Sequence, residues 1–394
     1  MTETEDLTRE EARQIIMNVG GAGQPPAHGY QFFTAGIEPY ISTLEEEYLR
    51  HYIKNGGSSF KLITGTYGGG KTHFLYTLQG RAWEHGYVTS YIELSPVSTP
   101  FHRLEEVYRA VASHLALPQS ELTGIEGLLR AWHQSKAEEF SGLSDDKLEK
   151  ALQDYLLTTG PYEITGFQNA VREAFMALHK GDMGSIGLLL QWLKGENPPL
   201  SELRKFGIFS KLEKSTAFRM MRCLIEWIED TGYPGLIVLM DEAEQTPSIS
   251  TRQKEAMLSN LRELVDACSS GAVRGAMFFY AVPDESFLEG RTAIYEALTQ
   301  RLSTVFEGEM NPSGVRIDLE TAGPEPLEML HEIGDKLAAI FETAYEISFD
   351  KKQLERVITG VAEQAYEEKY GEIGYKRTFV QKVVRAFHEL KGQA

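Results

Sequence analysis

The chain has 394 residues, of which 57 are Asp or Glu and 39 are Lys or Arg. The resulting net charge of -18 repels phosphate backbones and excludes non-specific duplex binding over the whole surface. The length suggests two or three packed units, and a hydrophobic fraction of 42% is enough to give them cores. Because the N-terminus is acidic and no segment approaches the ~20 apolar residues of a membrane helix, we expect a cytoplasmic protein that makes no membrane contact.

The first part of the chain alternates between helix and strand patterns. The predicted helices cover residues 8–18, 43–54, 72–83 and 101–117. The predicted strands cover residues 60–64 and 87–94, and a Gly/Pro-rich loop is predicted at 20–29. This order of strand, helix, strand and helix is typical of the start of a parallel α/β sheet.

From residue 118 to residue 200 only helices are predicted, and we interpret this segment as a helical insertion into the sheet domain. Strands are then predicted at 236–240 and 276–282, with a last short strand at 303–306. Helices are predicted at 215–230, 251–268 and 293–302. Beyond the sequence GPEP at 323–326 the pattern is helical, with candidates at 327–344, 351–370 and 377–391.

Residues 65–72 read GTYGGGKT and fit the pattern G-x-x-x-x-G-K-[S/T] at every fixed position. In such a loop the backbone N–H groups cradle phosphates, Lys71 would neutralise the β- and γ-phosphates, and the Thr72 hydroxyl would ligate Mg²⁺. A chance match is the alternative, but an apolar strand precedes the loop and a helix follows it. We therefore expect Mg-ATP to contact Gly65, Thr66, Tyr67, Gly68, Gly69, Gly70, Lys71, Thr72 and His73.

Two carboxylates, Asp241 and Glu242, follow the apolar strand at 236–240. Ligands of open α/β sheets bind at the carboxyl ends of the strands. We expect Asp241 to hold Mg²⁺ and Glu242 to polarise the attacking water, although a solvated acidic turn is the alternative. The helical insertion explains why these acids lie so far along the chain from Lys71.

Three further residues are candidates for nucleotide contacts. Asp284 follows the strand at 276–282, where ATPases of the AAA+ kind often place a polar sensor of the γ-phosphate, but it fits a helix N-cap equally well. Arg301 could reach the γ-phosphate of a neighbouring subunit. Arg377 begins the last helix, where a second sensor would lie. Either arginine could instead be a surface ion-pair partner.

Two stretches, 201–222 and 375–394, are basic in an otherwise acidic protein. They could meet DNA phosphates or an acidic partner. Solvated helix faces are the alternative for both.

The motif order resembles the BrxD family of bacterial BREX-system ATP-binding proteins. The resemblance is carried by Gly36-Ile37-Glu38, FKLI at 60–63, GTYGGGKTHFL at 65–75, YIELS at 91–95 and LIVLMDEAE at 236–244. It implies a role in anti-phage defence beside a helicase or nuclease. The resemblance also matches Gly65, Gly70, Lys71 and Thr72 to the phosphate loop, Asp241 and Glu242 to the acidic strand end, and Arg301 to the arginine-finger position of initiator-type AAA+ proteins.

The sequence therefore predicts an α/β P-loop ATPase with an AAA+-like parallel core. We expect the core at 1–117 and 201–322, the helical insertion at 118–200, and a C-terminal all-α domain at 323–394. The expected function is an ATP-dependent switch that forms a homo-oligomer and engages DNA or a DNA-acting partner. The alternatives are a transposition-type AAA+ regulator on DNA and a weakly hydrolysing ATP-binding scaffold, while a metabolic phosphotransferase fits poorly.

Overall fold

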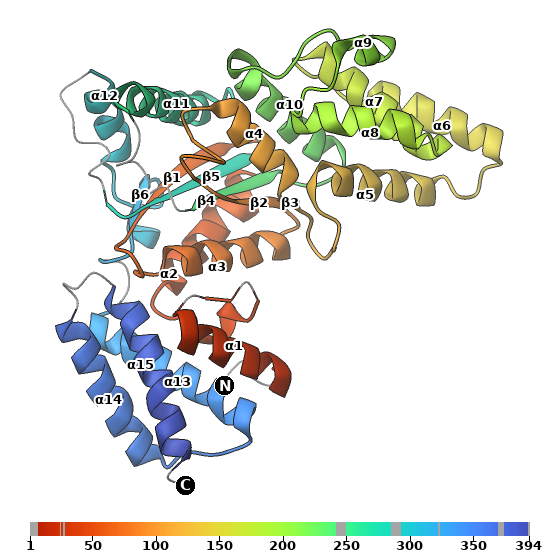
Figure 1. The fold of residues 1–394 in the computed structure, drawn as a ribbon. Helices are drawn as coiled ribbons and strands as arrows, with labels where there is room; N and C mark the ends of the chain where they lie inside the picture. The colour runs from red at the N-terminus through yellow and green to blue at the C-terminus, as the bar shows by residue number, and fades with distance from the viewer. Residues whose placement is uncertain are drawn as a thin grey trace.

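The structure is a computed structural model that describes residues 7–23, 25–26, 28–241, 250–284, 293–321, 324–368 and 374–392. Figure 1 shows a central sheet, an arm of helices on one side, and a bundle in which the two ends of the chain come together. In the described part of the chain, no helix has both the length and the apolar character needed to span a membrane.

Six strands form one sheet in the order β3-β2-β4-β5-β1-β6. Their bounds are β1 Ser58–Thr64, β2 Val88–Glu93, β3 Leu115–Ala116, β4 Leu236–Asp241, β5 Ala276–Val282 and β6 Arg316–Asp318. Every neighbouring pair is parallel except β2 and β3. The predicted α/β class with a parallel core is confirmed.

The central strands are buried on both faces, which explains their continuous apolar sequences. In β4, Leu236, Val238 and Met240 enter one core cluster, while Ile237 and Leu239 enter another on the opposite face. This alternation follows from the two-residue period of a strand. Helices must therefore cover both faces of the sheet.

One face is covered by three helical segments, namely α2 (Glu38–Thr43), the π-helical η3 (Leu44–Tyr52) and α3 (Lys71–Glu84). The other face is covered by α4 (Leu104–Ser113), α10 (Ala217–Asp230), α11 (Thr251–Ser270) and α12 (Ala293–Leu302). In α3 the buried side chains include Phe74, Leu75 and Leu78, which are the apolar residues that follow the glycine-rich loop.

Most of residues 118–200 are helical and project from the sheet as an arm (Figure 1). The arm contains α5 (Gly124–Glu139), α6 (Asp145–Thr158), α7 (Thr165–Lys180), α8 (Met183–Lys194) and α9 (Leu200–Leu203). Trp132 of α5 packs edge-on against Phe175 of α7 and Trp227 of α10, at ring-centroid distances of 4.5 Å and 6.1 Å. The arm thus shares its core with a helix of the sheet layer.

The N-terminal helix packs with the C-terminal helices. A separate core cluster joins buried side chains of α1 (Arg9–Ala22), α13 (Pro326–Tyr345), α14 (Lys351–Glu367) and α15 (Tyr375–Lys391). The helix predicted at 8–18 extends to Ala22, and Gly23 ends it with a φ of 61°.

Two local predictions were wrong. Residues 303–306 form no strand beyond a single bridge between Val305 and Arg316, and β6 takes the edge of the sheet instead. The helix predicted at 101–117 ends at Ser113, after which Leu115 pairs with Ser90 in the short antiparallel strand β3. Both positions lie at sheet edges, where pairing with a distant strand overrides local propensity.

We predict that the N-terminal helix stabilises the C-terminal bundle. Ile16 of α1 is fully buried in the shared core, whereas the adjacent Met17 is 67% exposed. Ile16→Ala should cost about 2–5 kcal/mol of bundle stability through lost burial and a cavity. Limited proteolysis of the bundle should detect this as faster cleavage. Met17→Ala is the matched control and should cleave at the wild-type rate; equal rates for both variants would contradict the docking of α1.

Candidate nucleotide-binding site

The glycine-rich loop connects the end of β1 at Thr64 to the start of α3 at Lys71. Gly68 and Gly70 have φ values of 77° and 103°, which side-chain-bearing residues rarely adopt. The Gly69 N–H donates to the Thr66 carbonyl at 2.9 Å and closes a tight turn. The loop therefore wraps around the N-terminus of α3, where backbone N–H groups attract anions.

The Lys71 side chain lies inside this loop. It is only 5% exposed, and its Nζ donates to the carbonyl oxygens of Gly65 at 2.8 Å and Thr66 at 3.2 Å. These neutral acceptors keep a buried ammonium group at the site where a phosphate would bind.

The adjacent residue connects the loop to the acidic strand. The Thr72 hydroxyl donates to Oδ2 of Asp241 at 2.7 Å, although the two residues are 169 positions apart. The Tyr91 hydroxyl, from β2, donates to the same oxygen at 2.7 Å. Burial raises the pKa of Tyr91, and the Asp241 carboxylate raises it further, so Tyr91 remains a proton donor at neutral pH.

The strand β5 lies between β1 and β4 and ends at the same level as the loop. Val282 pairs with Thr64, and the Gly65 N–H is shared between the carbonyls of Val282 and Pro283. Asp284, which is exposed, therefore follows β5 beside the beginning of the phosphate loop. Glu242 lies outside the described residues.

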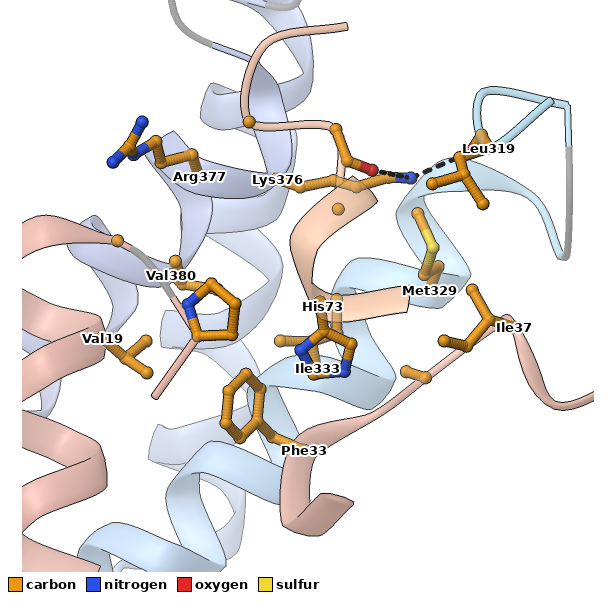
Figure 2. A pocket seen from close by; sticks show the side chains of 16 residues that line it. Val19, Phe33, Ile37, His73, Leu319, Met329, Ile333, Lys376, Arg377 and Val380 are labelled. Atoms are coloured by element: carbon orange, nitrogen blue, oxygen red, sulfur yellow. Dashed lines mark hydrogen bonds between the residues drawn. The ribbon is translucent and has the colours of Figure 1, made fainter. Parts of the chain in front are cut away.

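The C-terminal bundle contacts the loop directly. The Gly374 N–H donates to the Tyr67 carbonyl at 2.8 Å, and Lys376 Nζ donates to the carbonyls of Gly69 and Leu319, both at 3.0 Å (Figure 2). Burial lowers the pKa of Lys376, while Glu320 and Asp318 oppose this effect.

The neighbouring Arg377 makes different contacts. Its guanidinium lies 5.1 Å from the Tyr67 ring centroid, and its Nε donates to the Ala22 carbonyl at 2.9 Å. Figure 2 shows its charged end pointing away from Lys376 Nζ. Both residues contact the loop, Lys376 through the Gly69 carbonyl and Arg377 through the Tyr67 ring.

A carboxylate also touches the loop. Glu320 Oε1, just after β6, accepts from the Thr66 N–H at 3.0 Å and from the Thr66 hydroxyl at 2.8 Å. An added Cβ on Gly69 would lie 2.6 Å from the same oxygen. The Glu320 carboxylate therefore lies in space that any side chain at position 69 would fill.

A pocket opens beside the loop, between the loop and the C-terminal helices. Its lining combines residues of the loop and of the start of α3 with apolar side chains of the bundle and of the 3₁₀ segment Tyr30–Phe33. The loop and α3 contribute Gly68, Gly69, Gly70 and His73, and the apolar side chains include Val19, Phe33, Met329, Ile333 and Val380 (Figure 2). An apolar pocket beside a phosphate loop is suited to an aromatic base and its sugar.

His73 lies at the inner wall of this pocket. Its ring centroid is 5.0 Å from that of Phe33, and its Nε2 is 2.8 Å from the Thr34 hydroxyl. Burial lowers the pKa of His73 to about 4, and Lys376 and Lys336 contribute, so the ring is neutral at pH 7.

Arg301 lies away from these contacts. It is on α12 and forms a two-pronged ion pair with Asp266 of α11, with Nη2 to Oδ2 at 3.3 Å. Its Nη1 also donates to the Ala297 carbonyl at 2.9 Å. These contacts hold two helices of the same chain together.

Three residues at the site were missed by the sequence analysis, namely Tyr91, Glu320 and Lys376. A signal for Lys376 was present, because Val380 and Val384 follow it at helical spacing and place it on the apolar face of α15. Arg377 is followed by the polar Gln381 on the same spacing. Nothing in the local sequence pointed to Tyr91 or Glu320, whose contacts depend on strand pairing.

The sheet order, the loop around Lys71 and the acidic strand end define this protein as a P-loop nucleotide-binding protein with a helical C-terminal region. Residues 8–393 match the family model described as "BREX system ATP-binding protein BrxC/D". The chain belongs to this family of ATP-binding proteins of the BREX phage-defence system. Comparison with curated proteins found no match, and comparison with solved structures found none either.

We predict that Lys376 contributes to ATP affinity and that Arg377 contributes less. Removing a buried cation beside a triphosphate should cost about 1.5–3 kcal/mol, or roughly 10- to 100-fold in affinity. Titration with a fluorescent ATP analogue should show this loss for Lys376→Met.

The control is Lys382→Met on the same helix, since Lys382 pairs with Glu368 at 2.8 Å away from the loop. It should bind as the wild type does. If Arg377→Met weakens ATP binding more than Lys376→Met does, the larger contribution was assigned to the wrong residue.

Proposed function

We propose that this chain is a Mg-ATP-dependent ATPase that acts as a nucleotide-controlled switch in the BREX system. The observation that carries the proposal is the contact between Thr72 and Asp241 at 2.7 Å. It joins the start of the phosphate-loop helix to the acidic strand end, beside the buried ammonium group of Lys71. Anion-binding backbone, cation and carboxylate thus meet at one point, as phosphoryl transfer requires.

The donor set also fits Mg²⁺. Thr72 Oγ1 and the Asp241 carboxylate are hard oxygen ligands in contact, and Mg²⁺ favours a few such ligands together with substrate phosphates and water. When bound, the ion would neutralise developing charge on the phosphates. Tyr91 holds the Asp241 carboxylate in position, so we assign it an orienting role.

Glu242 is the proposed water-polarising residue, because it follows Asp241 directly at the carboxyl end of β4. Asp284 is the proposed γ-phosphate sensor at the end of β5. The adenosine group is assigned to the apolar pocket between the loop and the bundle. The alternative is an ATP-binding scaffold that hydrolyses ATP only weakly. Measurements of ATP turnover would distinguish it from the proposed ATPase.

The contacts of the C-terminal bundle with the loop explain how nucleotide would control shape. Gly374, Lys376 and Glu320 all bond to the segment that must also receive the phosphates. A bound triphosphate attracts Lys376 and repels Glu320. ATP and its hydrolysis product therefore differ in how firmly they hold the bundle against the core.

The proposed output of the switch is assembly. We assign Arg301 to the γ-phosphate site of a neighbouring subunit, which requires release of its ion pair with Asp266. A homo-oligomer formed in this way would act with a helicase or nuclease of the same defence system. A transposition-type regulator assembling on DNA is the alternative outcome of the same chemistry.

We predict that Lys71→Ala lowers ATP affinity roughly 10- to 100-fold, because a charged hydrogen-bond donor to phosphate is lost. Glu242→Gln should keep ATP binding but slow turnover at least 100-fold. The measurements are binding of a fluorescent ATP analogue and release of phosphate under single-turnover conditions. Glu255→Gln, an exposed carboxylate on α11, is the control and should behave as wild type.

Magnesium supplies a second readout. Asp241→Asn should bind ATP in EDTA as the wild type does but should lose most of the gain in affinity that Mg²⁺ gives. Wild-type turnover by Glu242→Gln would remove the assignment of the water-polarising residue. An unchanged Mg²⁺ effect in Asp241→Asn would remove that of the metal ligand.

A further inference from the structure

A positively charged loop connects α9 to α10 in the otherwise acidic chain. Residues 204–214, here called the basic loop, carry four exposed cations, Arg204, Lys205, Lys211 and Lys214, against one acid, Glu213. The loop is irregular apart from short 3₁₀ turns at Arg204–Phe206 and Lys214–Thr216. In Figure 1 it runs along the outer edge of the molecule beside α9 and α10.

The structure separates these cations from the other basic residues of the 201–222 stretch. Arg219 and Arg222 both pair with Glu163, each at 2.6 Å, and so serve the fold. Among the described residues, the four cations of the basic loop form no ion pair. They therefore keep their charge available to an external anion.

An aromatic ring lies between the two pairs of cations. Phe209 is 71% exposed, whereas Ile208 and Leu212 on either side of it are buried at 0% and 4% exposure. Burial of these two anchors forces the intervening residues outward. The exposed ring adds little to the core, and its position between two pairs of cations leaves its face open to a ligand.

The backbone under the ring is fixed. Trp192 Nε1 donates to the Ser210 carbonyl at 2.8 Å. Asn197 bonds to Leu212 twice, accepting from its N–H at 2.9 Å and donating to its carbonyl at 3.1 Å. Phe209 is thus presented on a preformed platform, which lowers the entropy cost of using it.

We propose that the basic loop is a binding site for single-stranded nucleic acid, with a base stacked on Phe209 and phosphates on the flanking cations. Ring stacking combined with a cationic track is how sequence-independent single-strand binders work. A protruding ring finds free base faces in a single strand but not in a stacked duplex. The net charge of -18 disfavours binding over most of the remaining surface.

An acidic polypeptide is the competing partner, because it would also be attracted to the four cations. Its carboxylates, however, would pair with the cations and would not stack on the exposed ring between them. The presence of Phe209 favours nucleic acid. The site is separate from the nucleotide pocket, so this inference does not depend on the proposed ATPase activity.

The test measures binding of a fluorescently labelled oligo-dT of 20 nucleotides to the full-length protein at low salt, by fluorescence anisotropy. Phe209→Ala should weaken binding roughly 5- to 100-fold, the loss expected for one stacked base. Phe209→Trp should retain binding. The matched control is Leu157→Ala on α6, since Leu157 is also 71% exposed but lies outside the basic loop, and it should bind as wild type.

Salt dependence tests the cations. Four phosphate contacts predict a slope of about -3 for log affinity against log salt, and Lys211→Glu should make this slope shallower. Tighter binding of a 20-base-pair duplex, or an unchanged affinity of Phe209→Ala, would overturn the proposal. If polyglutamate displaces the labelled oligo-dT from the wild-type protein as potently as unlabelled oligo-dT does, the loop would instead be assigned to an acidic protein.

Discussion

The hydrogen bond between Thr72 and Asp241 is the contact on which the site depends. It holds the first turn of α3 against the end of β4, two elements brought together only because β5 and β1 complete the sheet beside them. Tyr91 fixes the same carboxylate from the opposite neighbouring strand. Two hydroxyl donors to one oxygen hold this carboxylate in one orientation, as the proposed magnesium site requires.

The phosphate loop is also held from its outer side. The bundle formed by α1 and the C-terminal helices bonds to it through Gly374 and Lys376, and Glu320 bonds to Thr66. Among these contacts, the bond from the Thr66 N–H to Glu320 uses a donor for which a phosphate would compete. These contacts join the loop to a bundle with a separate core, and the proposed switch rests on them.

Much of the fold followed from local patterns. The P-loop was recognisable because its glycines, lysine and threonine act within eight consecutive residues, and the acidic strand because five apolar residues are buried on both faces. The predicted strand at 303–306 failed because the edge strand is chosen by pairing with β1, which leaves Arg316–Asp318 in that place. The contact of Lys376 with the loop was not predicted, since adjacent basic residues on a helix differ in the direction they face.

By itself, the sequence determined the phosphate loop, the parallel α/β class and the helical character of the insertion, because each depends on neighbouring residues and on periodicity. Only the tertiary structure decided that the N-terminal helix packs with the C-terminal helices and that Lys376 lies on the loop. It also separated Arg219 and Arg222, which pair with Glu163, from the exposed cations beside Phe209. Which residues pair and which stay exposed depends on groups far apart in the sequence, and these groups meet only when the chain is packed.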